Sequence, residues 1–109
     1  MRKAEVYRNG ILAGYLTEYQ SGNFTFSYAE PYFTDHNQPA ISLTLPKSQK
    51  EYHSNILFPF FSNMLSEGVN RHLQNVQWKI DENDDFGLLL KTARYDTIGA
   101  ISIKPIENE

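Results

Sequence analysis

The sequence of 109 residues contains no cysteine, which excludes disulfide bridges, thiolate metal sites and cysteine nucleophiles together. A chain without cysteine is typical of a reducing compartment, so we expect a cytoplasmic location. No apolar run approaches the roughly 18 residues that a membrane span needs. Residues Met1 to Glu5 lead directly into a strand-like pattern, so we expect neither a signal peptide nor a membrane partner.

Clusters of basic residues are also missing. Ten Lys and Arg residues are scattered along the chain against thirteen Asp and Glu residues, and the net charge is −3. Proteins that bind nucleic acid usually carry a basic stripe that faces the phosphates. A direct nucleic-acid partner is therefore not expected, and RNA binding through stacked Tyr and Phe side chains is kept only as a third alternative.

The chain shows no pattern that predicts a metal site, a cofactor or a catalytic centre. His36, His53 and His72 lie far apart, and no two have the i, i+4 spacing of ligands on one helix. The acidic run 81–85 lacks the glycine and the terminal glutamate of an EF-hand loop. Residues 85–87 read Asp-Phe-Gly as in protein kinases, but the glycine-rich loop, strand lysine and His-Arg-Asp loop are missing upstream. We interpret this segment as a helix cap followed by a core phenylalanine, and we predict no enzymatic activity.

The chain does contain enough apolar material for one core. Hydrophobic residues make up 40% of it, with seven Phe, seven Tyr and one Trp. Asn9-Gly10 is a strong hairpin signal, because both residues tolerate the positive φ of a type I′ turn. It predicts strands at 5–8 and 11–19.

Three more strands are expected after a turn at 21–23. They cover residues 24–28, 41–45 and 98–104, and a polar surface loop is expected at 31–39. Alternating apolar residues mark the strands at 24–28 and 41–45. Pro46 and Pro105 are expected to end the strands that precede them.

Three helices are expected between the strands at 41–45 and 98–104. They cover about 55–65, residues from 70 onward, and residues from 84 or 85 onward. Ser54 or Asn55 would cap the first helix, which carries Pro59 in its first turn, and Gly68 would end it. The predicted fold class is α+β: a mainly antiparallel sheet of about five strands covered by two or three helices, in a single domain that spans residues 1–109.

Two features favour a role in binding another protein. On the second predicted helix, Trp78 lies about 180° from the apolar stripe, on the side of Arg71, and exposed Trp and Arg are common in interface hot spots. Alternatively, Trp78 packs against a loop of its own domain. The loop 66–70 follows an apolar helix that has little polar face, so one side of that helix either meets a partner or is buried in the core. The predicted partner-binding residues are Ser66, Glu67, Gly68, Val69, Asn70, Arg71 and Trp78.

A series of short segments along the chain carries a family resemblance. The segments are Gly14-Tyr15-Leu16, Phe24-Thr25-Phe26-Ser27-Tyr28, Ile41-Ser42-Leu43-Thr44-Leu45-Pro46, Phe61-Ser62-Asn63-Met64-Leu65-Ser66-Glu67-Gly68, Asp85-Phe86-Gly87-Leu88-Leu89 and Asp96-Thr97-Ile98-Gly99-Ala100. In this order they resemble the N-terminal subdomain of HipA-type serine/threonine kinase toxins. They resemble even more closely the HipS-type antitoxins, which are its free-standing form in three-gene HipBST systems. The end of the chain at Glu109 fits the free-standing form.

The resemblance implies a function and a set of partners. In the resembled systems a separate kinase, HipT, lacks this subdomain and phosphorylates an aminoacyl-tRNA synthetase, and HipS binds and neutralises HipT. HipB is a DNA-binding third component. The resemblance thus implies an antitoxin that binds a HipT-like kinase with residues 66–71 near the active site, and a HipB-like protein as a further partner. A non-inhibitory subunit that completes the kinase fold is the alternative.

Two departures from the family pattern concern the same loop. The usual Leu-Pro-Glu-Gly is Leu65-Ser66-Glu67-Gly68 here, and Val69 stands where relatives often carry Trp. The loop therefore lacks the rigidity of proline and the aromatic group suited to filling a kinase cleft. Plugging of the active site and restraint of the kinase conformation both stay open as mechanisms.

Overall fold

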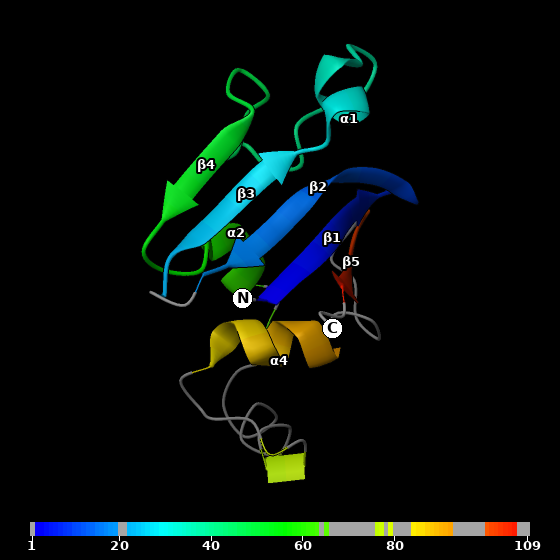
Figure 1. The fold of residues 1–109 in the computed structure, drawn as a ribbon. Coiled ribbons are helices and arrows are strands. Elements are labelled where there is room, and N and C mark those ends of the chain that lie inside the picture. The colour runs from blue at the N-terminus through cyan, green and yellow to red at the C-terminus, as the bar shows by residue number, and fades with distance from the viewer. Residues whose placement is uncertain are drawn as a thin grey trace.

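A computed structural model describes residues 2–19, 22–63, 65, 76–77, 79, 84–92 and 100–106 of the chain. Within these residues it contains five strands and three helices (Figure 1). The strands are β1 (Arg2–Arg8), β2 (Ile11–Glu18), β3 (Phe24–Tyr28), β4 (Glu51–Ser54) and β5 (Ile101–Ile106), and the helices are α1 (Glu30–Thr34), α2 (Pro59–Ser62) and α4 (Asp85–Thr92). The strands form one antiparallel sheet in the order β4-β3-β2-β1-β5. The predicted α+β class is confirmed.

Local turn chemistry produces the first three strands as predicted. Asn9 and Gly10 have φ values of 51° and 79°, the positive values that a type I′ hairpin turn needs. At the next turn Gly22 has a φ of 85°, and its N–H donates to the Tyr19 carbonyl oxygen at 2.9 Å. Each turn returns the chain along its neighbour, so β1, β2 and β3 form a meander.

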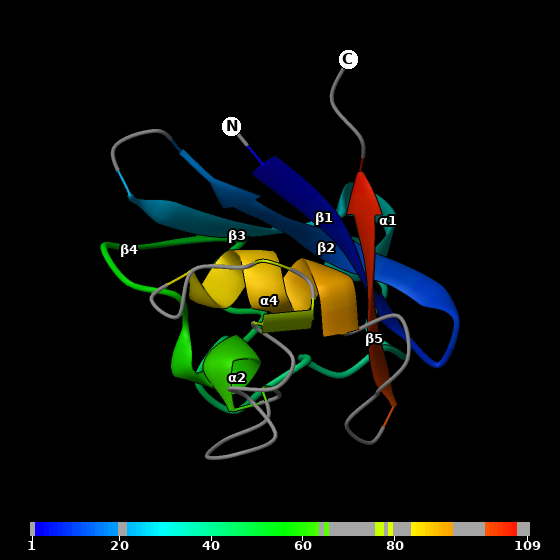
Figure 2. The same ribbon diagram turned by 90° about the horizontal axis from the view of Figure 1, so that it is seen from below.

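The core lies between one face of the sheet and helices α2 and α4, which Figure 2 shows together on that side. Strand β3 connects the sheet to both helices through aromatic contacts. Phe26 lies 5.8 Å from Phe61 of α2, and Phe24 lies 5.9 Å from Phe86 of α4, measured between ring centroids. These four rings are buried. The alternation of apolar residues in 24–28 therefore marks the face of β3 on which the helices pack.

Gly14 of β2 is required by the close approach of β3. A Cβ atom at this position would lie 2.4 Å from the backbone oxygen of Ser27 and 2.8 Å from the ring of Phe26. The neighbouring ring thus occupies the space of a side chain. The sheet has no room here for any residue larger than glycine.

The predicted strand at 41–45 is wrong. Residues 35–50 form an irregular loop between α1 and β4, and the fourth strand is β4, at 51–54. Ile41 and Leu45 are buried, as their apolar character suggests, but Leu43 between them is fully exposed. In a strand the three side chains would share one face. A turn at this point separates them instead.

Proline positions explain two smaller corrections. The predicted surface loop at 31–39 contains α1, which carries Pro31 in its first turn, where the missing N–H costs no helical hydrogen bond. Pro105 does not end the last strand but lies within β5, opposite Ala4. Because β5 is an edge strand, a residue without an N–H is tolerated there. Residues 98 and 99, where this strand was expected to begin, lie outside the described residues.

Among the predicted helices, the third is confirmed as α4 and the first is much shorter than expected. Helix α2 begins at Pro59, which occupies the first turn as predicted, and ends at Ser62. Neither Ser54 nor Asn55 caps it, because Ser54 belongs to β4 and the N-cap residue is Phe58. Most of the second predicted helix, and Gly68, lie outside the described residues.

Candidate functional site

The predicted partner-binding residues Ser66, Glu67, Gly68, Val69, Asn70, Arg71 and Trp78 all lie outside the described residues. The structure does describe the apolar segment that precedes them. Phe58, Phe61 and Leu65 are buried, and Phe60 is partly buried against the core. These side chains therefore contribute to the interior of the domain, while Ile56, just before them, keeps 61% of its surface exposed.

The loop 35–50 is held in place by three tyrosines whose hydroxyl groups donate to its backbone carbonyls. The pairs are Tyr28 with Leu45, Tyr32 with Pro39 at 2.6 Å, and Tyr52 with Pro46 at 2.5 Å. Lys47 adds a further anchor, because its ammonium group donates to the carbonyl oxygens of Asp35 and Gln38, both at 2.7 Å. The loop has no regular secondary structure, yet side chains bind several of its backbone carbonyl groups.

Tyr28 has the most buried of the three hydroxyl groups and serves two backbone groups of the loop. It donates to the Leu45 carbonyl and accepts the N–H of Ile41 at 3.1 Å. Burial raises the pKa of Tyr28 to about 12, so the hydroxyl keeps the proton that it donates. One side chain thus fixes both ends of the segment 41–45.

Between these two anchors lies a tight turn, residues 42–45, which we name the Leu43 turn. The N–H of Leu45 donates to the Ser42 carbonyl oxygen at 3.1 Å, and the N–H of Thr44 donates to the Ser42 hydroxyl at 3.2 Å. The hydroxyl groups of Ser42 and Thr44 also lie 2.9 Å apart. At the tip, Leu43 is 100% exposed. The turn therefore presents one large apolar side chain on a backbone held by hydrogen bonds.

An ion-pair network joins the start of the chain to the start of α4. The Arg2 guanidinium forms two parallel bonds to the Asp84 carboxylate, at 2.7 and 3.0 Å, and its Nε donates to Glu18 at 2.7 Å. The same group lies 5.4 Å from the centre of the Phe86 ring. Hydrogen bonding to Arg2 lowers the pKa of Asp84, and hydrogen bonding to Asp84 raises the pKa of Arg2 above its usual range.

Asp84 also caps α4, so the cap lies one residue before the Asp-Phe-Gly segment, whose Asp85 is the first residue of the helix, and the expected core phenylalanine is confirmed. The Asp84 carboxylate accepts the N–H of Gly87 at 3.0 Å, and Phe86 is fully buried. The carboxylate lies so close to Gly87 that a Cβ atom there would come within 2.2 Å of it. In this fold the segment is a helix start packed onto the sheet.

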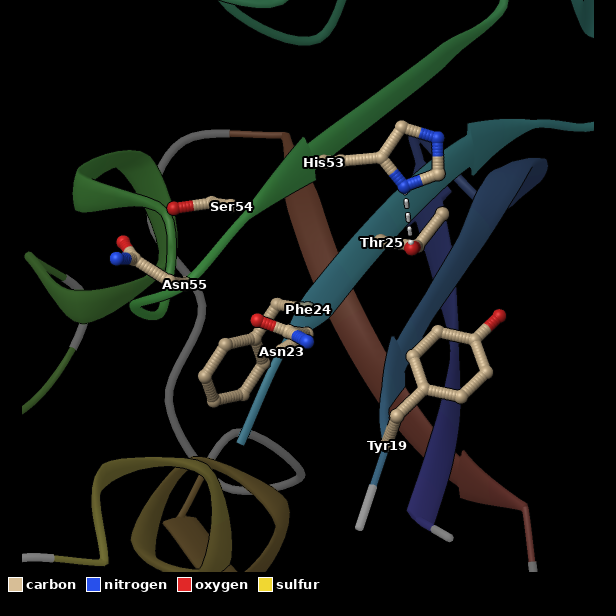
Figure 3. Close-up of a pocket in the computed structure, with 7 residues that line it drawn as sticks. All are labelled: Tyr19, Asn23, Phe24, Thr25, His53, Ser54 and Asn55. Atoms are coloured by element: carbon tan, nitrogen blue, oxygen red, sulfur yellow. Dashed lines mark hydrogen bonds between the residues drawn. The ribbon is translucent and has the colours of Figure 1, made fainter. Parts of the chain in front are cut away.

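A pocket of about 470 Å³ opens where β2 and β4 end and β3 begins (Figure 3). Its lining residues are Tyr19, Asn23, Phe24, Thr25, His53, Ser54 and Asn55. Thr25 and His53 are joined by a 3.0 Å contact between Oγ1 and Nδ1, which Figure 3 shows as a dashed line. Among the described residues, the lining offers hydroxyl, amide and imidazole groups but no carboxylate and no ammonium. It suits neutral hydrogen-bonding groups better than ions.

The face of the sheet opposite α2 and α4 carries polar side chains, some of which contact each other. His53 lies 3.0 Å from Glu51, and the Lys3 ammonium lies 4.7 Å from the centre of the Tyr15 ring. The Phe rings of β3 point the other way, into the core, and are not available for stacking on bases. This removes part of the surface that the RNA-binding alternative requires.

Two kinds of feature are absent from the described part of the chain. No group of three or more His, Asp or Glu side chains there is arranged to hold a metal ion. No helix there is long and apolar enough to cross a membrane.

Sequence reasoning missed the features that the structure brings together. Arg2 and Asp84 are 82 positions apart, and no local pattern indicates that they pair. The tyrosine anchors are equally non-local, since Tyr28 and Leu45 are 17 positions apart. The only available signal for the loop was its composition of Pro, Ser, Asn and Gln, which argues against a regular strand.

Over almost its whole length the chain is similar to a known domain. A family model described as the HipA N-terminal domain matches residues 4–104. A solved N-terminal domain of HipA toxin matches 100% of the chain and 96% of its own length, with a TM-score of 0.73 and 30% identity. The chain therefore belongs to the HipA N-terminal domain family. The match is to this domain and not to the catalytic domain of HipA.

The chain matches nearly all of one relative but only a small part of two others. A protein of Haemophilus influenzae is 34% identical over 104 residues, which cover 95% of this chain and 92% of that protein. Two candidate kinases of Sinorhizobium fredii, Y4mE and Y4dM, are 28% and 30% identical over 100% and 86% of this chain. The chain spans only 26% and 24% of their lengths. In these relatives the domain is one part of a much longer protein.

Proposed function

We propose that this chain is an antitoxin that binds a HipT- or HipA-like serine/threonine kinase and neutralises it. The observation that carries the proposal is the family match over residues 4–104. In the two candidate kinases this domain shares its chain with a partner region about three times its size. A domain that evolved against such a region retains a surface for it, so a separate copy can bind the same kind of kinase.

The H. influenzae relative supports a role for the domain outside a kinase chain. Matching residues cover 92% of that protein, which leaves little length for a catalytic domain. We assign no catalytic step and no cofactor to the chain itself. The proposed complex acts in the cytoplasm, where a kinase that halts translation meets its substrate, and a HipB-like DNA-binding protein is its third member.

We further propose that residues 66–71 and Trp78 contact the kinase near its active site. Leu65, which immediately precedes residues 66–71 in the sequence, is buried. Trp78 supplies the large amphipathic side chain that is common in hot spots. Inhibition then follows either from blocking the cleft or from holding the kinase in an inactive conformation.

A test of the antitoxin function is co-expression with the HipA-like kinase encoded in the same genome. We expect the chain to relieve growth arrest and to purify with the kinase. Persisting arrest without a complex would show that the proposal is wrong. Trp78→Ala is expected to weaken the complex, whereas Tyr19→Ala, which changes a 44% exposed aromatic residue elsewhere, serves as the matched control.

A second candidate function is that of a non-inhibitory subunit that completes the kinase fold. It is favoured by the candidate kinases in which this domain belongs to the same chain. A phosphorylation assay of the purified complex separates the two functions. Kinase activity that falls on complex formation supports the antitoxin, and undiminished activity supports the structural subunit.

A further inference from the structure

The Leu43 turn combines complete exposure of an apolar side chain with a well-anchored backbone. A single exposed leucine is ordinary on a protein surface, so its exposure alone does not indicate a binding site. The neighbours of Leu43 are the unusual part, because Ile41 and Leu45 are 7% and 3% exposed and both are bonded to the buried hydroxyl of Tyr28. The chain thus holds the leucine outward with buried residues on both sides.

The backbone of the turn is already ordered, which lowers the entropic cost of binding through Leu43. A flexible loop loses backbone freedom when it docks, and this loss reduces the affinity that burial provides. Here the hydrogen bonds within residues 42–45, and the tyrosine anchors on either side, have already removed most of that freedom. Most of the free energy gained by burying the leucine in a partner would therefore contribute to the affinity.

The chemistry around Leu43 indicates what kind of site receives it. The flanking side chains, Ser42 and Thr44, are neutral, and their hydroxyl groups contact each other. The ammonium of Lys47 is turned inward, with bonds to two carbonyls and a position 5.1 Å from the Tyr32 ring centre. The turn therefore presents an apolar tip with an uncharged rim, which fits an apolar pocket of a protein rather than a phosphate-bearing partner.

We propose that Leu43 inserts into an apolar pocket of the kinase and anchors this domain to it. The inference rests on the proposed function, since it names a contact of that same complex. The kinase is the expected partner, because in the candidate kinases about three quarters of the chain lies beyond this domain and is covalently joined to it. Among the described residues, Leu43 is the most exposed of the large apolar side chains, and its turn is held by hydrogen bonds.

The test compares two aspartate substitutions in the complex with the HipA-like kinase encoded in the same genome. Leu43→Asp is expected to weaken binding about 10- to 100-fold, the value of burying one leucine side chain. Ile11→Asp is the matched control, because Ile11 is an apolar residue, 44% exposed, on the β1–β2 hairpin. Its affinity should stay within about twofold of wild type. Both variants should keep the melting temperature of the wild type, since neither side chain is buried.

The possible outcomes separate the inference from the function on which it rests. A wild-type complex that Leu43→Asp leaves unchanged overturns the inference alone, and so does an equal loss of affinity in both variants. A wild-type chain that does not bind the kinase overturns both. If the chain instead forms a dimer that Leu43→Asp dissociates, the receiving pocket belongs to a second copy and the inference is wrong.

Discussion

Replacing Tyr28 by phenylalanine would remove one hydroxyl that satisfies two backbone groups of the loop 35–50. The variant keeps the ring, whose edge packs against Phe26 at a centroid distance of 4.9 Å, so the apolar core is preserved. What it loses is the donor to the Leu45 carbonyl and the acceptor of the Ile41 N–H. Because all three residues are buried, water cannot easily replace the hydroxyl.

The expected cost follows from these two groups. A buried backbone group left without a partner costs about 1–3 kcal/mol, so Tyr28→Phe, which leaves two such groups, should lower the free energy of unfolding by roughly 2–6 kcal/mol. Tyr52→Phe is the matched control, because its hydroxyl serves a single carbonyl, that of Pro46, in an exposed position where water can take over. Its cost should stay below about 1 kcal/mol.

Urea unfolding, followed by circular dichroism, measures both values. With a slope of about 2 kcal/mol per molar urea, the middle of the usual range, Tyr28→Phe should move the midpoint down by roughly 1–3 M. Amide hydrogen exchange at Ile41 should also become faster, because its acceptor is gone. Equal midpoints for the two variants would refute the reasoning, since they would show that Tyr28 does not hold the loop from within the core.

Two further substitutions test the network at α4 and the close approach in the sheet. Asp84→Asn should lower the free energy of unfolding at pH 7 by about 1 kcal/mol, as the charged pair with Arg2 is lost. The pKa of Asp84 is lowered in the folded state, so the extra stability of wild type over Asp84→Asn should be complete above about pH 4 and should shrink as the pH falls further. A difference in urea midpoints that does not change with pH would contradict this. Gly14→Ala should cost about 2–3 kcal/mol in urea unfolding, because its Cβ atom would lie 2.4 Å from the Ser27 oxygen. Gly10→Ala, which meets no atom within 4 Å but keeps a φ of 79°, should cost only about 1 kcal/mol, and the reverse order would contradict the steric argument.

The parts of the fold that were predicted correctly depend on short stretches of chain. Asn9-Gly10 specifies its hairpin because positive φ is a property of those two residues. The apolar alternation of 24–28 and the acidic start of α4 are likewise local, and both are confirmed. The family resemblance, carried by segments spread over the whole chain, is confirmed by the match to residues 4–104.

The fourth strand shows why a local pattern can mislead. Ile41, Leu43 and Leu45 alternate with polar residues as a half-buried strand does, whereas the observed β4, at 51–54, has no such alternation of apolar residues. The pattern indicates that some of these side chains are buried, but it does not distinguish a strand from a turn that buries them. The predicted contact residues 66–71 and Trp78 remain predictions, because they lie outside the described residues.

The amino-acid sequence by itself determined the turns, the core-facing side of β3 and the family, because φ preferences and hydrophobic periodicity act between neighbours in the chain. Only the tertiary structure decided that Tyr28 anchors Ile41 and Leu45, that Arg2 meets Asp84, and that Leu43 points outward. These contacts join residues that are distant in the chain. The choice of a hydrogen-bond partner depends on which groups are brought together and shielded from water, and that is settled only when the sheet and its helices pack.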